Sequence, residues 1–278
     1  MTVSALTRNN IIGIANLSDS LEIADSFGMN AKSAQEQAKV ESLISSFVPE
    51  LTPHVSGICL SAEVGFSATE NLPLDTGLVF ELSDMLRPKD PLSVPVLSQI
   101  WGVEQTSNNN AVAKLELFYN PQEEEARSKK QMVVELYDYC QHENIPLLLD
   151  LILYLETSKD KYQAQFLELQ LDAIQELRQY CDLIALEYPS DALSAVTLTA
   201  ELDIHWILSG RGVPYETYKE QLRISLESGA VGYLVGSQFL PDKVTKDSQT
   251  FIETTVRDRA IELNRIATET MERSSTEV

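Results

Sequence analysis

The chain has 278 residues, 44% of them hydrophobic, and its 42 Asp and Glu against 21 Lys and Arg give a formal charge of -21. Its length would suit one α/β barrel of about 250 residues, while the charge argues against nucleic acid or an anionic membrane as a partner, because both would repel it. The cysteines lie far from one another and are odd in number, which argues against a disulfide framework: Cys59, Cys140 and Cys181. The histidines are also separate from one another, which disfavours a zinc centre: His54, His142 and His205.

The first residues carry no export signal. Met1 to Asn10 lack the charged-then-apolar pattern of a signal peptide, and no apolar run approaches the roughly 20 residues that a membrane helix needs. We therefore expect a cytoplasmic protein without a membrane partner.

Short apolar runs of strand length recur along the whole chain. Eight are predicted as strands: Ile11-Leu17, Gly57-Val64, Gly77-Leu82, Val112-Tyr119, Pro146-Leu153, Leu183-Tyr188, Ile204-Leu208 and Val231-Val235. Apolar residues repeat at helical spacing in six further stretches: Ala31-Phe47, Glu123-His142, Lys161-Tyr180, Asp191-Leu202, Pro214-Ser228 and Ser248-Glu272.

Strands that alternate with helices predict a parallel sheet, and eight such units favour closure into a (β/α)8 TIM barrel, although the pattern alone also allows an open sheet. The whole chain, residues 1–278, is then one domain, with a polar, frayed tail from about residue 269. Phe66-Thr76 is short for a crossover helix and Asp84-Gln105 contains three prolines, so both are expected to be irregular loops over the barrel mouth.

One lysine stands inside an apolar strand. Lys114, Glu116 and Phe118 alternate with leucines and therefore share one side of the fourth strand. An interior lysine is costly unless it is paired, and desolvation lowers its pKa toward the range in which the neutral amine attacks a carbonyl. Lys114 is therefore either a candidate nucleophile or the partner of a neighbouring carboxylate.

The next two strands carry one carboxylate each, Asp150 and Glu187. The active site of a barrel lies at the carboxyl ends of its strands, so both are candidates for proton transfer beside Lys114. Each could instead be a helix cap or an ion-pair partner.

Glycines and small hydroxyl residues occur at the ends of the last two strands, where barrels commonly bind phosphate. Backbone N–H groups there can hold an anion, and a guanidinium can add a bidentate contact. The predicted substrate-binding residues of these loops are Ser209, Gly210, Arg211, Gly236 and Ser237. Alternatively, the glycines serve only tight turns.

The segment from Val112 to about Leu240 resembles the class I tagatose-bisphosphate aldolases and the related sulfofructose-phosphate aldolases. Upstream, the stretch Ser61 to Gly65 is similar to the family's Asp-Pro-Glu-Tyr-Gly and keeps its glutamate, Glu63, while Ile11 to Leu21 agrees in hydrophobic pattern. The residues that carry the resemblance are Lys114 to Asn120, Glu143 to Asp150, Asp182 to Pro189, Ser209, Gly210 and Gly236.

The resemblance implies a barrel that cleaves a ketose phosphate reversibly into dihydroxyacetone phosphate and an aldehyde, through a lysine Schiff base and without a metal or other cofactor. It implies an acid–base role for Asp150, which stands where the family has a glutamate, and an assisting role for Lys114. Substrate contacts are expected at Glu63 and Asp19.

The chain departs from the family pattern in three places. Ala185 stands where the family has its imine-forming lysine, Leu17 to Asp19 replace Asp-Gln-Arg, and Ser237 replaces an arginine. Alanine has no nucleophile. Arg211 could replace the phosphate charge lost at Ser237, because both loops face one anion site.

Three functions remain open. The first is an aldehyde-lyase whose Schiff base has moved to Lys114, with Asp150 and Glu187 passing protons. The second is a degenerate barrel that binds a phosphorylated sugar or triose phosphate as a sensor, regulator or assembly component. The third is another chemistry, such as an isomerisation that uses only the carboxylates. The sequence leaves the oligomeric state and any protein partner open.

Overall fold

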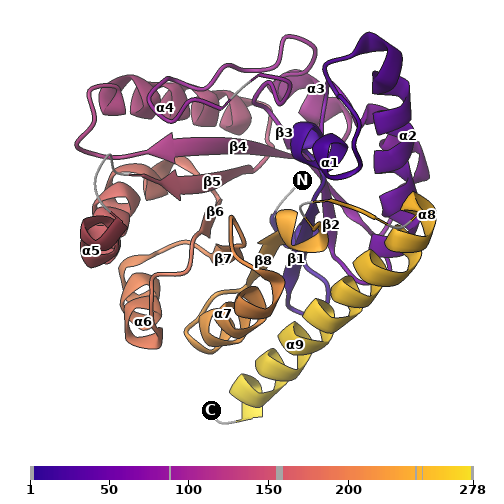
Figure 1. Ribbon diagram of the computed structural model, residues 1–278. Coiled ribbons are helices and arrows are strands. Elements are labelled where there is room, and N and C mark those ends of the chain that lie inside the picture. The colour runs from indigo at the N-terminus through magenta and orange to yellow at the C-terminus, as the bar shows by residue number, and fades with distance from the viewer. Residues whose placement is uncertain (1–2, 88, 155–158, 242, 246, 277–278) are drawn as a thin grey trace.

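The computed structural model describes residues 3–276, apart from 88, 155–158, 242 and 246. Within them, the strands pair in chain order, every pair is parallel, and pairing of the first strand with the last closes the barrel (Figure 1). The strands are β1 Ile12–Asn16, β2 Gly57–Ser61, β3 Gly77–Glu81, β4 Val112–Tyr119, β5 Leu147–Leu153, β6 Leu183–Leu186, β7 Trp206–Ser209 and β8 Gly232–Val235. The predicted TIM barrel is confirmed, and the open sheet is excluded.

Helices surround this barrel and cover the outer faces of its strands (Figure 1). They are α1 Ser20–Ser26, α2 Ala34–Leu51, α3 Val103–Asn108, α4 Ala126–His142, α5 Lys159–Leu177, α6 Ala192–Glu201, α7 Tyr215–Glu227, α8 Ser248–Phe251 and α9 Arg257–Thr276, with a π-helical turn between the last two. None of the described helices is long and apolar enough to cross a membrane.

Two helices and the C-terminal end differ from the prediction. Short helices α1 and α3 were not expected, since neither is long enough to show a helical repeat. The polar segment from residue 269 was predicted to fray, but α9 continues to Thr276 because its apolar side packs on the barrel.

The barrel interior changes character along its axis. Its amino-terminal half is apolar and contains Cys59, Leu148, Leu183 and Ile207 among others, and Leu6 from the N-terminal 3-10 helix packs against it. Towards the carboxyl ends of the strands, charged side chains take over the same inward-facing positions. Since inward positions alternate along a strand, Leu115 and Leu117 of β4 face the helices instead.

The connection between β3 and α3 reaches over this charged end. It folds back on itself, because Ser98 donates a backbone hydrogen bond to Leu82 and Asp84 donates one to Val96. Lys129 of α4, fully buried, donates to the carbonyl oxygen of Pro91 at 2.5 Å and holds the connection from outside. The segment from Asp84 is therefore irregular as predicted until α3 begins at Val103, whereas the other predicted loop, Phe66-Thr76, begins with a 3-10 helix, Phe66–Asn71.

Candidate functional site

Lys114 lies at the centre of the charged end and has no contact with solvent. Its Nζ is 2.6 Å from Oε2 of Glu81 and 3.1 Å from Oδ2 of Asp150, which come from the two neighbouring strands. Burial acts to lower the pKa of Lys114, but these two carboxylates raise it well above its ordinary value. The side chain is therefore a fixed ammonium ion.

Both carboxylate oxygens of Glu81, at the end of β3, accept hydrogen bonds. While Oε2 accepts from Lys114, Oε1 accepts from the backbone N–H of Ser83 at 3.0 Å and from that of Glu116 at 3.3 Å. These contacts fix the carboxylate against two strands. Glu81 was not predicted as a site residue, although it is an acidic residue at the end of an apolar strand, the same signal that identified Asp150.

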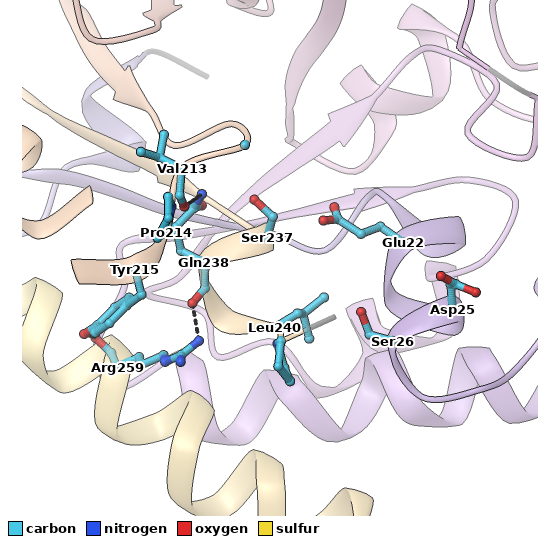
Figure 2. Close-up of a pocket in the computed structure, with 12 residues that line it drawn as sticks. Glu22, Asp25, Ser26, Val213, Pro214, Tyr215, Ser237, Gln238, Leu240 and Arg259 are labelled. Atoms are coloured by element: carbon cyan, nitrogen blue, oxygen red, sulfur yellow. Dashed lines mark hydrogen bonds between the residues drawn. The ribbon is translucent and has the colours of Figure 1, made fainter. Parts of the chain in front are cut away.

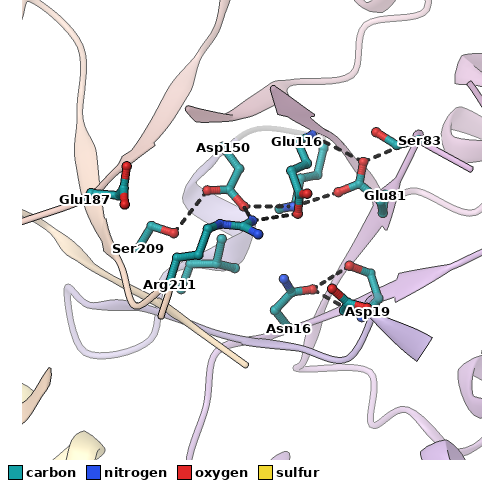
Figure 3. A network of polar contacts seen from close by, with 12 residues as sticks. Asn16, Asp19, Glu81, Ser83, Glu116, Asp150, Glu187, Ser209 and Arg211 are labelled. Carbon is teal, nitrogen blue, oxygen red and sulfur yellow. Dashed lines mark hydrogen bonds and ion pairs between the residues drawn. The ribbon is translucent and has the colours of Figure 1, made fainter. Parts of the chain in front are cut away.

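Asp150 is fully buried and joins Lys114 to the loop after β7 (Figure 3). It accepts from Ser209 Oγ at 3.1 Å, and Arg211 Nη2 lies 3.1 Å from Asp150 Oδ2 and 2.6 Å from Glu116 Oε2. Burial acts to raise the pKa of Asp150, but the cations Lys114 and Arg211 hold it at about 2. Asp150 is therefore a charged acceptor at neutral pH.

Lys89, from the loop after β3, completes the charged network. Its Nζ is 2.6 Å from Oδ2 of Asp19 and 3.0 Å from Oε1 of Glu116. Asp19 also caps α1 by accepting from the backbone N–H of Glu22 at 3.1 Å. The predicted contribution of Asp19 to the mouth thus has a structural basis, whereas Lys89 was missed because its loop has no periodic pattern.

Glu187 follows β6, and in Figure 3 it lies on the opposite side of Asp150 from Glu116 and Glu81. Its Oε2 accepts from the backbone N–H of Leu153 at 3.2 Å, and the side chain is half-buried. Burial raises the pKa of Glu187 to about 7, against the weaker lowering effect of this hydrogen bond and of Arg211. A carboxyl group with this pKa can both take up and release a proton near neutral pH.

Replacing Glu187 by glutamine is expected to make the protein more stable than the wild type at pH 8 but not at pH 4.5. Below pH 4.5, which is the ordinary pKa of a glutamate, Glu187 carries its proton in both the native and the unfolded wild type. Between pH 4.5 and about 7, Glu187 loses its proton in the unfolded chain but keeps it in the native protein. Over this range the unfolding free energy of the wild type therefore falls by about 1–3 kcal/mol relative to that of the variant. Urea unfolding at both pH values, with the exposed Glu104→Gln as control, tests this; a difference that does not change with pH contradicts it.

The remaining predicted residues fall into two groups. Gly210, Gly236 and Ser237 line a cavity at the strand ends, together with Ser209 and Arg211. Glu63 does not line it; its carboxylate oxygens are buried below the β3–α3 connection, and burial raises its pKa.

The two glycines have packing reasons of their own. A Cβ on Gly236 would lie 2.9 Å from the carbonyl oxygen of Asn16, and one on Gly210 would lie 2.6 Å from Oε1 of Gln238. Close approach of neighbouring elements therefore accounts for both, and neither requires a bound anion.

The cavity at the strand ends, called here the mouth cavity, has a volume of about 320 Å³. Besides the residues above, its lining includes Asn16, Asp19, Glu22, Lys89, Glu116, Asp150 and Gln238. A wider outer pocket of about 560 Å³ adjoins it, between α1 and the loops after β7 and β8 (Figure 2). No group of His, Cys, Asp and Glu among the described residues is arranged to hold a metal ion.

The fold and the site define an α/β barrel with a cavity lined by acidic and basic side chains at the carboxyl ends of its strands. The family model of the DeoC/LacD family aldolases matches residues 23–240. The chain therefore belongs to the DeoC/LacD aldolase family, a family of sugar-phosphate metabolism, in agreement with the resemblance seen in the sequence.

Single relatives are distant. Tagatose 1,6-diphosphate aldolase 1 from Streptococcus mutans is 28% identical over 165 residues, which cover 55% of this chain and 50% of that protein, so the match spans about half of the relative's length. An archaeal fructose 1,6-bisphosphate aldolase superposes with a TM-score of 0.67 at 14% identity, covering 95% of this chain and 96% of its own. A fructose-bisphosphate aldolase from Slackia heliotrinireducens superposes with a TM-score of 0.66 at 12% identity, and the match covers 99% of this chain and 90% of the aldolase chain. The two structures support the fold alone.

Proposed function

We propose that this protein binds a phosphorylated sugar or triose phosphate in the mouth cavity, and that Lys114, buried outside the lining of that cavity, serves as a fixed cation rather than as a Schiff-base nucleophile. The observation that supports this most directly is the enclosure of Lys114 between Glu81 and Asp150. The proposal therefore favours a binding protein built on an aldolase barrel over a lyase with a relocated imine.

Imine formation needs a neutral amine that can reach the carbonyl carbon. Lys114 is fully buried, does not line the mouth cavity, and has a raised pKa. Removing its proton would leave the carboxylates of Glu81 and Asp150 side by side in the barrel interior with less compensation. Both access and protonation state therefore disfavour attack by Lys114.

The sixth strand offers no substitute. Ala185 pairs in register with Asp150 and belongs to the apolar layer below the charged network. If it corresponds to the family's imine-forming position, as the sequence resemblance implies, the barrel lacks a nucleophile at that level. The side chains above it bind and orient, and none is placed to form the covalent intermediate.

The charges of the mouth cavity argue against a bisphosphate ligand. Its lining contains two cationic side chains, Lys89 and Arg211, and both already pair with carboxylates. Four acidic residues line the same cavity, Asp19, Glu22, Glu116 and Asp150. Four negative charges against two positive leave a net charge of -2, which opposes a bisphosphate more strongly than a monophosphate. Hydroxyl groups of the ligand, by contrast, can donate to these carboxylates.

One observation favours a second candidate function, proton transfer by carboxylates in an aldose–ketose isomerisation. The environment separates the pKa values of two carboxyl groups from neighbouring strands, with Glu187 at about 7 and Asp150, which lines the mouth cavity, at about 2. Such separation is how acid and base roles are divided in other active sites. Under this candidate, Glu187 exchanges protons with the ligand and Asp150 fixes its hydroxyl groups.

The test is to incubate the protein with dihydroxyacetone phosphate and sodium borohydride, and then to measure the intact mass and the heat of binding. We expect binding without a mass increase, because an amine held as an ammonium ion forms no reducible imine. A Schiff-base-forming aldolase carried through the same protocol is the positive control.

An adduct mapped to Lys114 would overturn the proposal and establish a relocated Schiff base. If no binding of dihydroxyacetone phosphate can be measured, the proposed binding function is wrong. Interconversion of an aldose phosphate and its ketose, lost on replacing Glu187 by glutamine, would favour the isomerase candidate.

A further inference from the structure

A second, more apolar cavity of about 330 Å³ lies beneath the β3–α3 connection, called here the loop pocket. Phe118 of β4 and four residues of the connection, Met85, Val94, Pro95 and Val96, give it an apolar lining. It is a different cavity from the outer pocket, which lies beside α1 and the last two strand loops. None of the residues singled out from the sequence as site residues lines it.

The loop pocket adjoins the mouth cavity. Lys89 and Glu116 line both, and the contact of 3.0 Å between Lys89 Nζ and Glu116 Oε1 lies on their common wall. Lys89 belongs to the connection and is about three-tenths exposed, so the wall consists partly of a long side chain that can rotate. A ligand that enters the mouth cavity can therefore extend past this wall.

We infer that the ligand of this protein has two parts, a hydroxylated carbonyl head group held in the mouth cavity and an apolar hydrocarbon or aromatic substituent held in the loop pocket. The inference rests on the proposed function for its head group and goes beyond it in the substituent. The substrate class is then a small amphipathic carbonyl compound rather than a simple sugar bisphosphate.

The chemistry of the two cavities supports this division. Carboxylates and two cations around the mouth cavity match hydroxyl, carbonyl and phosphate groups, whereas burying a hydrocarbon group against Phe118 and Met85 removes apolar surface from water. Asp84, Arg87, Asp90 and Ser93 also line the loop pocket, but most of its lining surface is apolar and therefore suits a hydrocarbon group better than a sugar hydroxyl. Ser83 Oγ is buried there without a hydrogen-bond partner among the described residues, so one polar group can still orient a substituent.

The test uses 1-hydroxy-2-ketones of increasing chain length, from hydroxyacetone to 1-hydroxyoctan-2-one, with dihydroxyacetone phosphate as the head-group probe. Calorimetry is expected to show affinity rising by up to about fourfold for each added methylene, with an increasingly negative heat-capacity change. Val96→Trp, which places a large side chain in the loop pocket, is expected to reduce the gain over the series to less than about twofold in all.

Val196→Trp is the matched control, because Val196 is similarly exposed, at 51% against 42% for Val96, but lies on α6 away from the loop pocket. This variant should keep the wild-type dependence on chain length. Thermal unfolding of both variants verifies that they fold.

The outcomes separate this inference from the proposed function. Binding of dihydroxyacetone phosphate without any dependence on ketone chain length overturns the apolar substituent and leaves the proposed function standing. A chain-length dependence without binding of dihydroxyacetone phosphate supports the loop pocket and contradicts the phosphate ligand. A chain-length dependence that Val96→Trp leaves unchanged, or no binding of any probe, overturns the inference.

Discussion

Replacing Lys114 by methionine is expected to lower the free energy of unfolding at pH 7 by about 3–5 kcal/mol, the cost of removing one partner from a buried ion pair. Methionine matches the length of the lysine side chain but leaves Glu81 and Asp150, both fully buried, without the cation between them. Urea unfolding followed by circular dichroism measures the loss. The deficit should shrink as the pH falls from 3.8 to about 2, because the stability that the lowered pKa of Asp150 gives the wild type is lost over that range.

Two further variants show whether the lost charge, and not the lost side-chain volume, is responsible. Lys114→Met combined with Glu81→Gln should recover part of the stability, since it also removes one unpaired charge. Lys130→Met changes a partly exposed lysine of α4 whose Nζ lies 3.4 Å from Glu176, and should cost at most about 1 kcal/mol. If Lys114→Met costs no more than Lys130→Met, the fixed-cation role is wrong.

Replacing Arg211 by glutamine is expected to weaken the binding of dihydroxyacetone phosphate by about 10- to 100-fold, the effect of losing a charge-assisted contact worth about 1.5–3 kcal/mol. Arg211 is one of two cations that line the mouth cavity, and its loss changes the net charge of the lining from -2 to -3. The same change removes the contacts of Arg211 with Glu116 and Asp150, so a smaller loss of stability accompanies it. Calorimetry at constant ionic strength measures the affinity.

Arg223→Gln is the control for this experiment. Arg223 lies on α7 and pairs at 2.9 Å with Glu220, three residues earlier on the helix surface, and it does not line the mouth cavity. Its replacement should leave the affinity unchanged. Equal affinity of the Arg211 variant and the wild type would mean that the phosphate binds elsewhere, and the outer pocket beside Arg259 would be the next place to examine.

The barrel itself could be predicted because each strand is a short apolar run that is buried on both faces. The run Val112-Tyr119 coincides with β4, and most other boundaries differ by one to three residues. The differences arise at strand ends, where hydrogen bonding and not hydrophobicity decides the limit; Val64, for instance, is buried yet lies beyond the last paired residue of β2.

The site could be predicted only in part, because contacts between strands depend on register. Alternation along β4 placed Lys114 and Glu116 on one side, and the structure shows both facing the interior, but no sequence pattern brings Glu81 to Lys114. Lys89 was out of reach for another reason: its position depends on how an irregular, proline-containing loop folds back over the mouth. Glu187 was predicted to converge on Lys114; its hydrogen bond goes to the backbone N–H of Leu153, and its role beside Lys114 stays a prediction.

The close approach of Gly236 to Asn16 joins the end of the last strand to the end of the first. Residues from both ends of the barrel sequence therefore contribute to the mouth cavity. The two residues whose contact closes the barrel, Asn16 and Gly236, lie very far apart along the chain. Closing so long a loop costs entropy before any contact offsets it, which slows folding. During synthesis the mouth cavity cannot form until β8 has left the ribosome, so a nascent or truncated chain that ends before Gly232 contains most of the charged network but no complete binding site.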